Sequence, residues 1–115
     1  MNRLLLFDLD GTLLRPEKTI SPANLQALDD CRRAGCGIGI ATARYAGSAQ
    51  AYVCQVQPDV LITSCGALAK VQGKTVYQDG FAPGDVQRVF ACIRHICGAN
   101  TEMTGRHSAR PFLEL

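Results

Sequence analysis

The sequence contains no tryptophan, few aromatic residues (6%), no block of basic residues and no long apolar run. Its net charge of +2 comes from scattered Lys and Arg, a pattern that argues against nucleic-acid binding. The first apolar run, residues 4–7, is interrupted at once by Asp8 and Asp10, so it is neither a signal-peptide core nor a membrane span. We therefore expect a cytoplasmic protein with no membrane or nucleic-acid partner.

Paired cysteines with metal-binding spacing are also absent. The six cysteines, at positions 31, 36, 54, 65, 92 and 97, form no C-x-x-C pair, and no nearby histidine completes a zinc-ligand spacing. We expect reduced thiols packed as small hydrophobic side chains, with disulfide bonding as the alternative.

The remaining composition is that of a globular protein. Hydrophobic residues make up 47% of the 115 positions and charged residues 19%. A chain of this length forms about one domain and can bury a core of its own, and it has no room for a second complete domain.

Three short apolar runs predict buried strands, at residues 4–7, 37–41 and 60–63. Each run ends in a polar turn. Strands separated by helices form right-handed crossover units of a parallel sheet, in which ligands bind beyond the carboxyl ends of the strands. The fold class is therefore α/β, and the three turns should converge on one site.

Cap signals place the helices between these strands. Ser21 followed by Pro22 is typical of a helix N-cap and first helical position, and Gly35 is a suitable residue just beyond the end of that helix. A second helix is predicted over residues 46–56.

Beyond the third strand, the pair Gln72 and Gly73 predicts the turn of a hairpin between residues 68–71 and 74–77. Asp85 is then expected to cap a further helix, because apolar residues follow it at spacings of three and four.

The residues with the clearest chemical signal follow the first strand. Asp8 and Asp10 lie two apart in an extended segment, so both carboxylates face the same side. Gly11 permits a sharp turn, after which backbone amides can point at an anion. This combination suits a phosphate with a divalent cation, whereas an isolated Asp pair would more often cap a turn.

The run FDLDGTL at residues 7–13 resembles the first signature motif, DxDGT, of the haloacid dehalogenase-like superfamily. IATAR at residues 40–44 is similar to the second motif, and ITSCGA at residues 62–67 to the Cof-like, or sugar-phosphatase-like, branch. The resemblance implies a Rossmann-like core, a parallel sheet flanked by helices, with an inserted α/β cap. Residues 1–82 would be a partial core without its later strands, and residues 83–115 the start of the cap.

The same resemblance implies roles for individual residues. Asp8 would attack phosphorus to give an aspartyl-phosphate, and Asp10 would act as its acid and base. Mg²⁺ would be held by Asp8 and by the main-chain carbonyl of Asp10. Thr42 would donate its hydroxyl to the phosphoryl oxygens, and Arg44 would help position the substrate.

The function implied is Mg²⁺-dependent hydrolysis of a small phosphorylated metabolite, for example a sugar phosphate. Ala43 and Cys65 stand where this branch usually has Gly and Asn, and these departures concern substrate recognition. The family's third-motif Lys and fourth-motif Asp residues follow the cap and are not contained in this sequence. A non-catalytic fragment, a phosphate-binding module and a phosphomutase or other phosphotransferase therefore stay open, as does self-association through an incomplete sheet edge.

Overall fold

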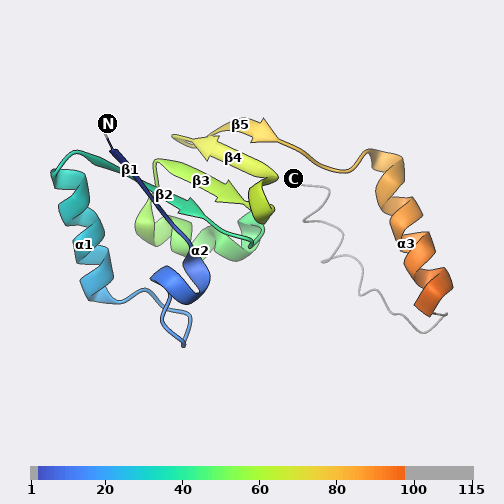
Figure 1. Ribbon diagram of the computed structural model, residues 1–115, viewed down its shortest axis with the longest axis horizontal. Helices are drawn as coiled ribbons and strands as arrows, with labels where there is room; N and C mark the ends of the chain where they lie inside the picture. The colour runs from blue at the N-terminus through green and yellow to red at the C-terminus, as the bar shows by residue number, and fades with distance from the viewer. Residues whose placement is uncertain (1–2, 98–115) are drawn as a thin grey trace. The chain divides into compact units, whose positions relative to one another are not determined.

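The computed structural model describes residues 3–97 (Figure 1). The chain divides into two compact units, Met1–Gln78 and Asp79–Leu115. That the second unit begins a cap, with the division at residue 82, stays a prediction. Its remainder, residues 98–115, lies outside the described residues.

The first unit is built on one five-stranded sheet with the strands in chain order. They are β1 (Arg3–Phe7), β2 (Cys36–Ala41), β3 (Val60–Thr63), β4 (Leu68–Val71) and β5 (Lys74–Gln78). β1 pairs with β2, and β2 with β3, in parallel, as predicted. β4 and β5 continue the sheet in antiparallel fashion, so the parallel sheet of the prediction is in fact mixed. β1 is an edge strand of this sheet. Self-association of the chain through an incomplete sheet edge stays a prediction.

The hairpin turn has the backbone geometry that its sequence predicts. Gln72 and Gly73 both have positive φ, 51° and 77°, as the favoured two-residue hairpin turns require. Gln72 also donates its backbone N–H to the carbonyl of Asp59, 2.8 Å away, and its side-chain amide to the Asp59 carboxylate at 3.0 Å. The turn is thereby tied to the start of β3.

Two helices fill the crossovers of the parallel strands, α1 (Pro22–Arg33) and α2 (Ala46–Val56). The predicted N-cap is confirmed, because Ser21 Oγ accepts the backbone N–H of Asn24 at 3.1 Å. Gly35, just beyond α1, has a φ of +87°, a left-handed conformation that glycine adopts without strain.

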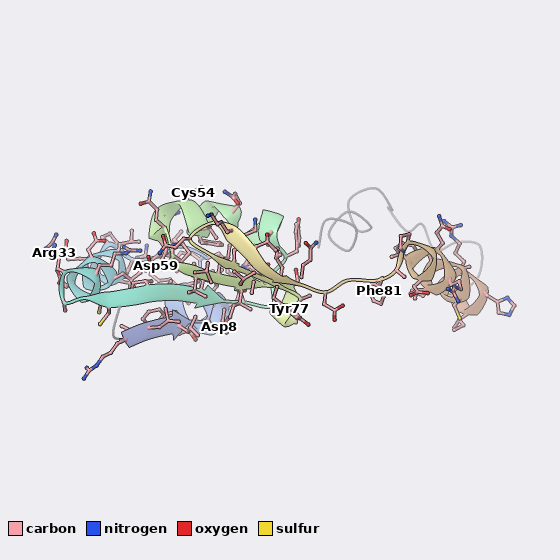
Figure 2. All side chains as sticks on the ribbon, turned by 90° about the horizontal axis from the view of Figure 1, so that it is seen from above. Asp8, Arg33, Cys54, Asp59, Tyr77 and Phe81 are labelled. Atoms are coloured by element: carbon pink, nitrogen blue, oxygen red, sulfur yellow. The ribbon has the colours of Figure 1, made fainter. Side chains whose placement is uncertain are left out.

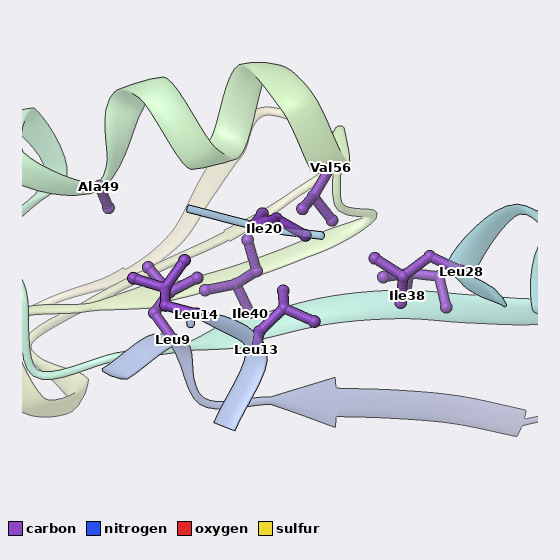
Figure 3. Packing of buried hydrophobic residues seen from close by; sticks show 9 residues of the cluster. All are labelled: Leu9, Leu13, Leu14, Ile20, Leu28, Ile38, Ile40, Ala49 and Val56. Atoms are coloured by element: carbon purple, nitrogen blue, oxygen red, sulfur yellow. The ribbon is translucent and has the colours of Figure 1, made fainter. Parts of the chain in front are cut away.

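The core lies between these helices and one face of the sheet (Figure 3). Leu28 of α1, Val56 of α2 and the alternate residues Ile38 and Ile40 of β2 are all less than 5% exposed. Both helices therefore cover the same face of β2. The alternate residues of β1 that point to the other face, Leu4 and Leu6, are 42% and 49% exposed.

Replacing the α1 N-cap should destabilise the first unit. In Ser21→Ala the Asn24 amide loses its acceptor, and we expect the free energy of unfolding to fall by about 1 kcal/mol. Ser21→Asp restores an acceptor and should retain the native value. Urea titration followed by circular dichroism measures both variants; equal stability of Ser21→Ala and the native chain would contradict this role.

The second unit contains helix α3 (Pro83–Cys97). The prediction that Asp85 caps it was wrong, because the helix begins at Pro83, whose fixed φ and missing N–H suit a first helical position. Asp85 instead lies in the first turn and pairs with Arg88 at 2.8 Å.

The cysteines are free thiols, as predicted, wherever the structure describes their side chains. Their expected packing as small hydrophobic residues is wrong for three of them. Cys31 and Cys36 are half-buried, but Cys54, Cys65 and Cys92 are exposed. Within the first unit, Cys54 and Cys65 occupy positions that do not meet the core. Within residues 3–97, no helix has the length and apolar content needed to cross a membrane.

Candidate active site

Three polar turns meet at the carboxyl ends of β1, β2 and β3, as the parallel pairing of these strands requires. Asp8 follows β1, Thr42 follows β2 and Ser64 follows β3. Backbone hydrogen bonds join the segments at the ends of β2 and β3, from Thr42 N–H to the Ile62 carbonyl at 2.9 Å and from Ser64 N–H to the Arg44 carbonyl at 2.8 Å. The predicted convergence is confirmed, and the carboxyl ends of the strands are where such sheets bind ligands.

The turn after β1 leaves Asp8 exposed (Figure 2). Leu9 and Leu13 are buried and flank a turn in which the backbone of Asp10 is extended and that of Gly11 is left-handed. Gly11 within the turn has a φ of +77°, which permits the chain to reverse there. Asp8 Oδ1 accepts the N–H of Leu9 at 2.8 Å, so its carboxylate has a fixed orientation.

Asp10 is held by two cations. The Arg44 guanidinium donates from Nε to Asp10 Oδ2 at 2.7 Å and from Nη2 to Oδ1 at 2.8 Å, a bidentate pair. Lys18 Nζ lies 2.9 Å from Oδ1. Hydrogen bonds from Arg44 and then from Lys18 hold the pKa of the Asp10 carboxyl well below its usual range, and the bond to Asp10 raises the pKa of Arg44. Asp10 is therefore ionised in this state of the site.

A second group of side chains supports these cations. Arg44 Nη1 donates to Ser48 Oγ at 3.1 Å, and the guanidinium lies 5.3 Å from the centroid of the Tyr52 ring. The Tyr52 hydroxyl donates to the Lys18 carbonyl at 2.8 Å. The sequence analysis missed Lys18, Ser48 and Tyr52. A spacing of four residues separates Arg44 from Ser48 and Ser48 from Tyr52, and it could have indicated that the last two lie beside Arg44. No neighbouring residue in the sequence indicated a role for Lys18.

Thr42 lies at the base of the site, only 5% exposed. Its Oγ accepts the backbone N–H of Arg44 at 3.1 Å, which leaves the hydroxyl hydrogen to donate to another acceptor. The predicted contact of Thr42 with a phosphoryl group stays a prediction, as does the substrate contact of Arg44.

The turn after β3 is conformationally unusual. Ser64, Cys65 and Gly66 have successive positive φ values of 53°, 55° and 94°. The hydroxyls of Thr63 and Ser64 are buried and have no hydrogen-bond partner within residues 3–97. Unpaired buried hydroxyls and left-handed non-glycine residues both cost free energy, so the rest of the fold must stabilise this turn.

The donor atoms at these strand ends are compatible with Mg²⁺. Residues 3–97 contain no cluster of three or more His, Cys, Asp or Glu side chains that could hold a metal ion. Mg²⁺, however, is commonly bound by one or two carboxylates, with phosphate and water oxygens completing its shell. Asp8 offers such an exposed carboxylate, while the Asp10 side chain is bound by its two cations.

A model of the haloacid dehalogenase-like hydrolase family matches residues 5–101. The chain belongs to this family. Pyridoxal phosphate phosphatase YbhA of Escherichia coli (strain K12) is 46% identical over 43 residues, which are 37% of this chain and 16% of the relative. The resemblance inferred from the two motifs is thus confirmed.

Solved structures of several similar proteins share the fold. The phosphatase BT1666 of Bacteroides thetaiotaomicron has a TM-score of 0.69 and 28% identity over 84% of this chain and 36% of its own. The sugar phosphatase BT4131 has a TM-score of 0.65 and 26% identity over 82% and 38%. A protein of Geobacillus kaustophilus HTA426, with a TM-score of 0.76 and 22% identity over 81% and 36%, supports the fold alone. The chain thus spans little more than a third of these structures.

Proposed function

We propose that this chain carries the nucleophile and the acid/base of a Mg²⁺-dependent phosphatase that acts on a small phosphate monoester in the cytoplasm. The observation that carries the proposal is the arrangement after β1, where Asp8 is exposed and Asp10, two residues on, is held by Arg44 and Lys18. Two findings support the proposal: the chain belongs to a hydrolase family, and the proteins to which it is similar include phosphatases.

In the first step, an Asp8 oxygen attacks phosphorus while the bond from phosphorus to the leaving oxygen breaks. Asp10 gives its proton to that oxygen. In the second step, Asp10 takes a proton from water, the water oxygen attacks phosphorus, and the bond to Asp8 breaks to release phosphate. Bound Mg²⁺ would supply positive charge against the repulsion between carboxylates and phosphate.

The ionised Asp10 must gain a proton before it can act as an acid. A phosphate dianion bound beside this carboxylate disfavours its negative charge. It therefore raises the pKa of Asp10 and favours the protonated form. Arg44 and Lys18 oppose that shift, and they favour the ionised form that the second step needs. Thr42, whose Oγ accepts the Arg44 N–H, would donate its hydroxyl hydrogen to a phosphoryl oxygen.

The substrate class that fits is a small phosphorylated metabolite. Among similar proteins, YbhA is a phosphatase of pyridoxal phosphate and BT4131 a sugar phosphatase. Sugar phosphates are therefore suitable first substrates. The same Asp8 intermediate serves a phosphomutase if a sugar hydroxyl replaces water as the acceptor, and release of inorganic phosphate distinguishes the two activities.

Removal of Mg²⁺ tests the proposal directly. With p-nitrophenyl phosphate as substrate, we expect EDTA to lower the hydrolysis rate by at least about 100-fold, because one preorganised electrostatic contact to the transferred group contributes roughly 10²–10³ in rate. Excess Mg²⁺ should restore the rate. Hydrolysis that is unaffected by EDTA would exclude the metal-dependent mechanism, and phosphate binding without hydrolysis would favour a binding module.

A further inference from the structure

We propose that Tyr52 is a positioning residue for Asp10, acting through both of the cations that hold the carboxylate. The inference rests on the proposed function in that Asp10 is taken as the acid/base. Tyr52 lies on α2, far along the chain from Asp10, and belongs to no motif of the sequence. Its side chain nevertheless contacts Arg44 through the ring and the Lys18 segment through the hydroxyl.

The first contact restrains Arg44. The guanidinium carbon lies 5.3 Å from the Tyr52 ring centroid, within the range of a cation–π interaction. Arg44 also donates to Ser48, one helical turn before Tyr52 on the same face of α2. The ring is partly buried against the hydrophobic core, so packing restricts its own movement. The bidentate donors of Arg44 are thereby presented to Asp10 in one orientation.

The second contact restrains Lys18. This residue has a φ of +63°, a left-handed conformation that is unfavourable for a lysine and needs support from its surroundings. The Tyr52 hydroxyl supplies part of that support by donating to the Lys18 carbonyl at 2.8 Å. The Lys18 N–H donates to the Arg15 carbonyl at 2.8 Å, which closes the turn. The Lys18 ammonium is thus kept 2.9 Å from Asp10 Oδ1.

One side chain therefore controls both partners of the same carboxylate. Asp10 Oδ1 receives hydrogen bonds from Arg44 and from Lys18, and Oδ2 a further one from Arg44. The contact with Lys18 needs only the Tyr52 hydroxyl, and the contact with Arg44 needs only the Tyr52 ring. Tyr52→Phe therefore removes the contact with Lys18 alone, whereas Tyr52→Leu removes both contacts. If Tyr52 merely filled the core, the two substitutions would not affect Lys18 and Arg44 separately.

Hydrogen exchange followed by NMR tests the positioning without requiring turnover. In Tyr52→Phe we expect exchange of the Lys18 amide to rise about 3- to 10-fold, the equivalent of one neutral hydrogen bond, while exchange of the Arg44 Nε–H stays native. In Tyr52→Leu the Arg44 Nε–H should also exchange about tenfold faster. Tyr77→Phe, an exposed tyrosine on β5, is the matched control and should leave both signals native.

Native exchange at both groups in Tyr52→Leu would overturn the proposal. If Tyr52→Leu does not fold, Tyr52→Phe decides, since an unchanged Lys18 amide in that variant also contradicts it. Amide protection along α1, which Tyr52 does not support directly, reports whether each variant keeps its fold. None of these readouts depends on phosphatase activity, so they separate this inference from the proposed function.

The dependence of hydrolysis on the leaving group provides a second readout. Glycerol 2-phosphate has a poor leaving group that needs a proton from Asp10, whereas p-nitrophenolate leaves without one. In a single turnover, which isolates the first step, Tyr52→Phe should slow leaving-group release from glycerol 2-phosphate about 3- to 10-fold and from p-nitrophenyl phosphate less than about twofold. Equal losses on the two substrates would show a merely structural role and overturn the proposal. Unchanged p-nitrophenyl phosphate hydrolysis in Asp8→Asn would instead contradict the proposed function.

Discussion

Asp8→Asn is expected to abolish phosphoryl transfer, lowering the rate of p-nitrophenyl phosphate hydrolysis by roughly 10⁴–10⁶-fold, the range found when single members of a catalytic triad are removed. An amide is a poor nucleophile and a poor ligand for Mg²⁺, so the substitution removes two functions at once. The substitution should leave the fold intact, because the Asn side-chain carbonyl can still accept the Leu9 N–H that Asp8 accepts in the native chain.

The matched control for this prediction is Asp30→Asn, an exposed aspartate near the end of α1 that pairs with Arg33 and with no residue of the site. It should retain native activity. Beryllofluoride, a mimic of an aspartyl-phosphate, offers a test that needs no turnover. Its ¹⁹F NMR signal should appear with the native chain and with Asp30→Asn, and be absent with Asp8→Asn. Native hydrolysis rates in Asp8→Asn would remove Asp8 from the mechanism.

Asp10→Asn should slow hydrolysis of an alkyl phosphate by about 10²–10⁴-fold, the usual contribution of a positioned general acid or base. With p-nitrophenyl phosphate the first step needs no acid, so Asp8 can still accept the phosphoryl group. The second step still needs a base to deprotonate water. We therefore expect the phosphorylated protein to accumulate in Asp10→Asn.

Acid quenching after incubation with a labelled aryl phosphate measures this accumulation. The native chain should retain little label, and the Asp8→Asn,Asp10→Asn double variant none. The neutral amide also loses the charge that Arg44 and Lys18 pair with, so part of the effect is loss of positioning. Absence of label in Asp10→Asn, together with equal losses on aryl and alkyl substrates, would contradict an acid/base role.

The position of Arg44 refines what the motif resemblance implied. Three of its five N–H donors are used, two by Asp10 and one by Ser48. The other two are available to a phosphoryl or sugar oxygen without breaking the pair with Asp10. Arg44 can therefore both position the acid/base and contact the substrate, and the substrate contact stays a prediction.

Local sequence was sufficient for most of the architecture. Ser21 and Pro22 predict the start of α1, and Gln72 and Gly73 predict the hairpin turn, because each effect depends on neighbouring backbone groups only. The start of α3 was misjudged at Asp85 because two signals competed within one turn, and the proline at residue 83 determined the first helical position. Apolar runs likewise predict the strands, but the predicted burial on both faces is wrong for β1, because Leu4 and Leu6 on its outer face are 42% and 49% exposed.

The sequence by itself determined the family and the candidate nucleophile, because DxDGT after an apolar strand places two carboxylates and a glycine turn within a few residues. Only the tertiary structure decided what surrounds Asp10. Its pair with Arg44, and the pair of Tyr52 with Lys18, each join residues 34 positions apart. Such contacts depend on how α2 packs against the sheet and on the path of the loop before α1, and no local propensity encodes either. The exposure of Cys54 has the same origin, since Ala49 and Val56, and not Cys54, lie on the face of α2 that meets the core.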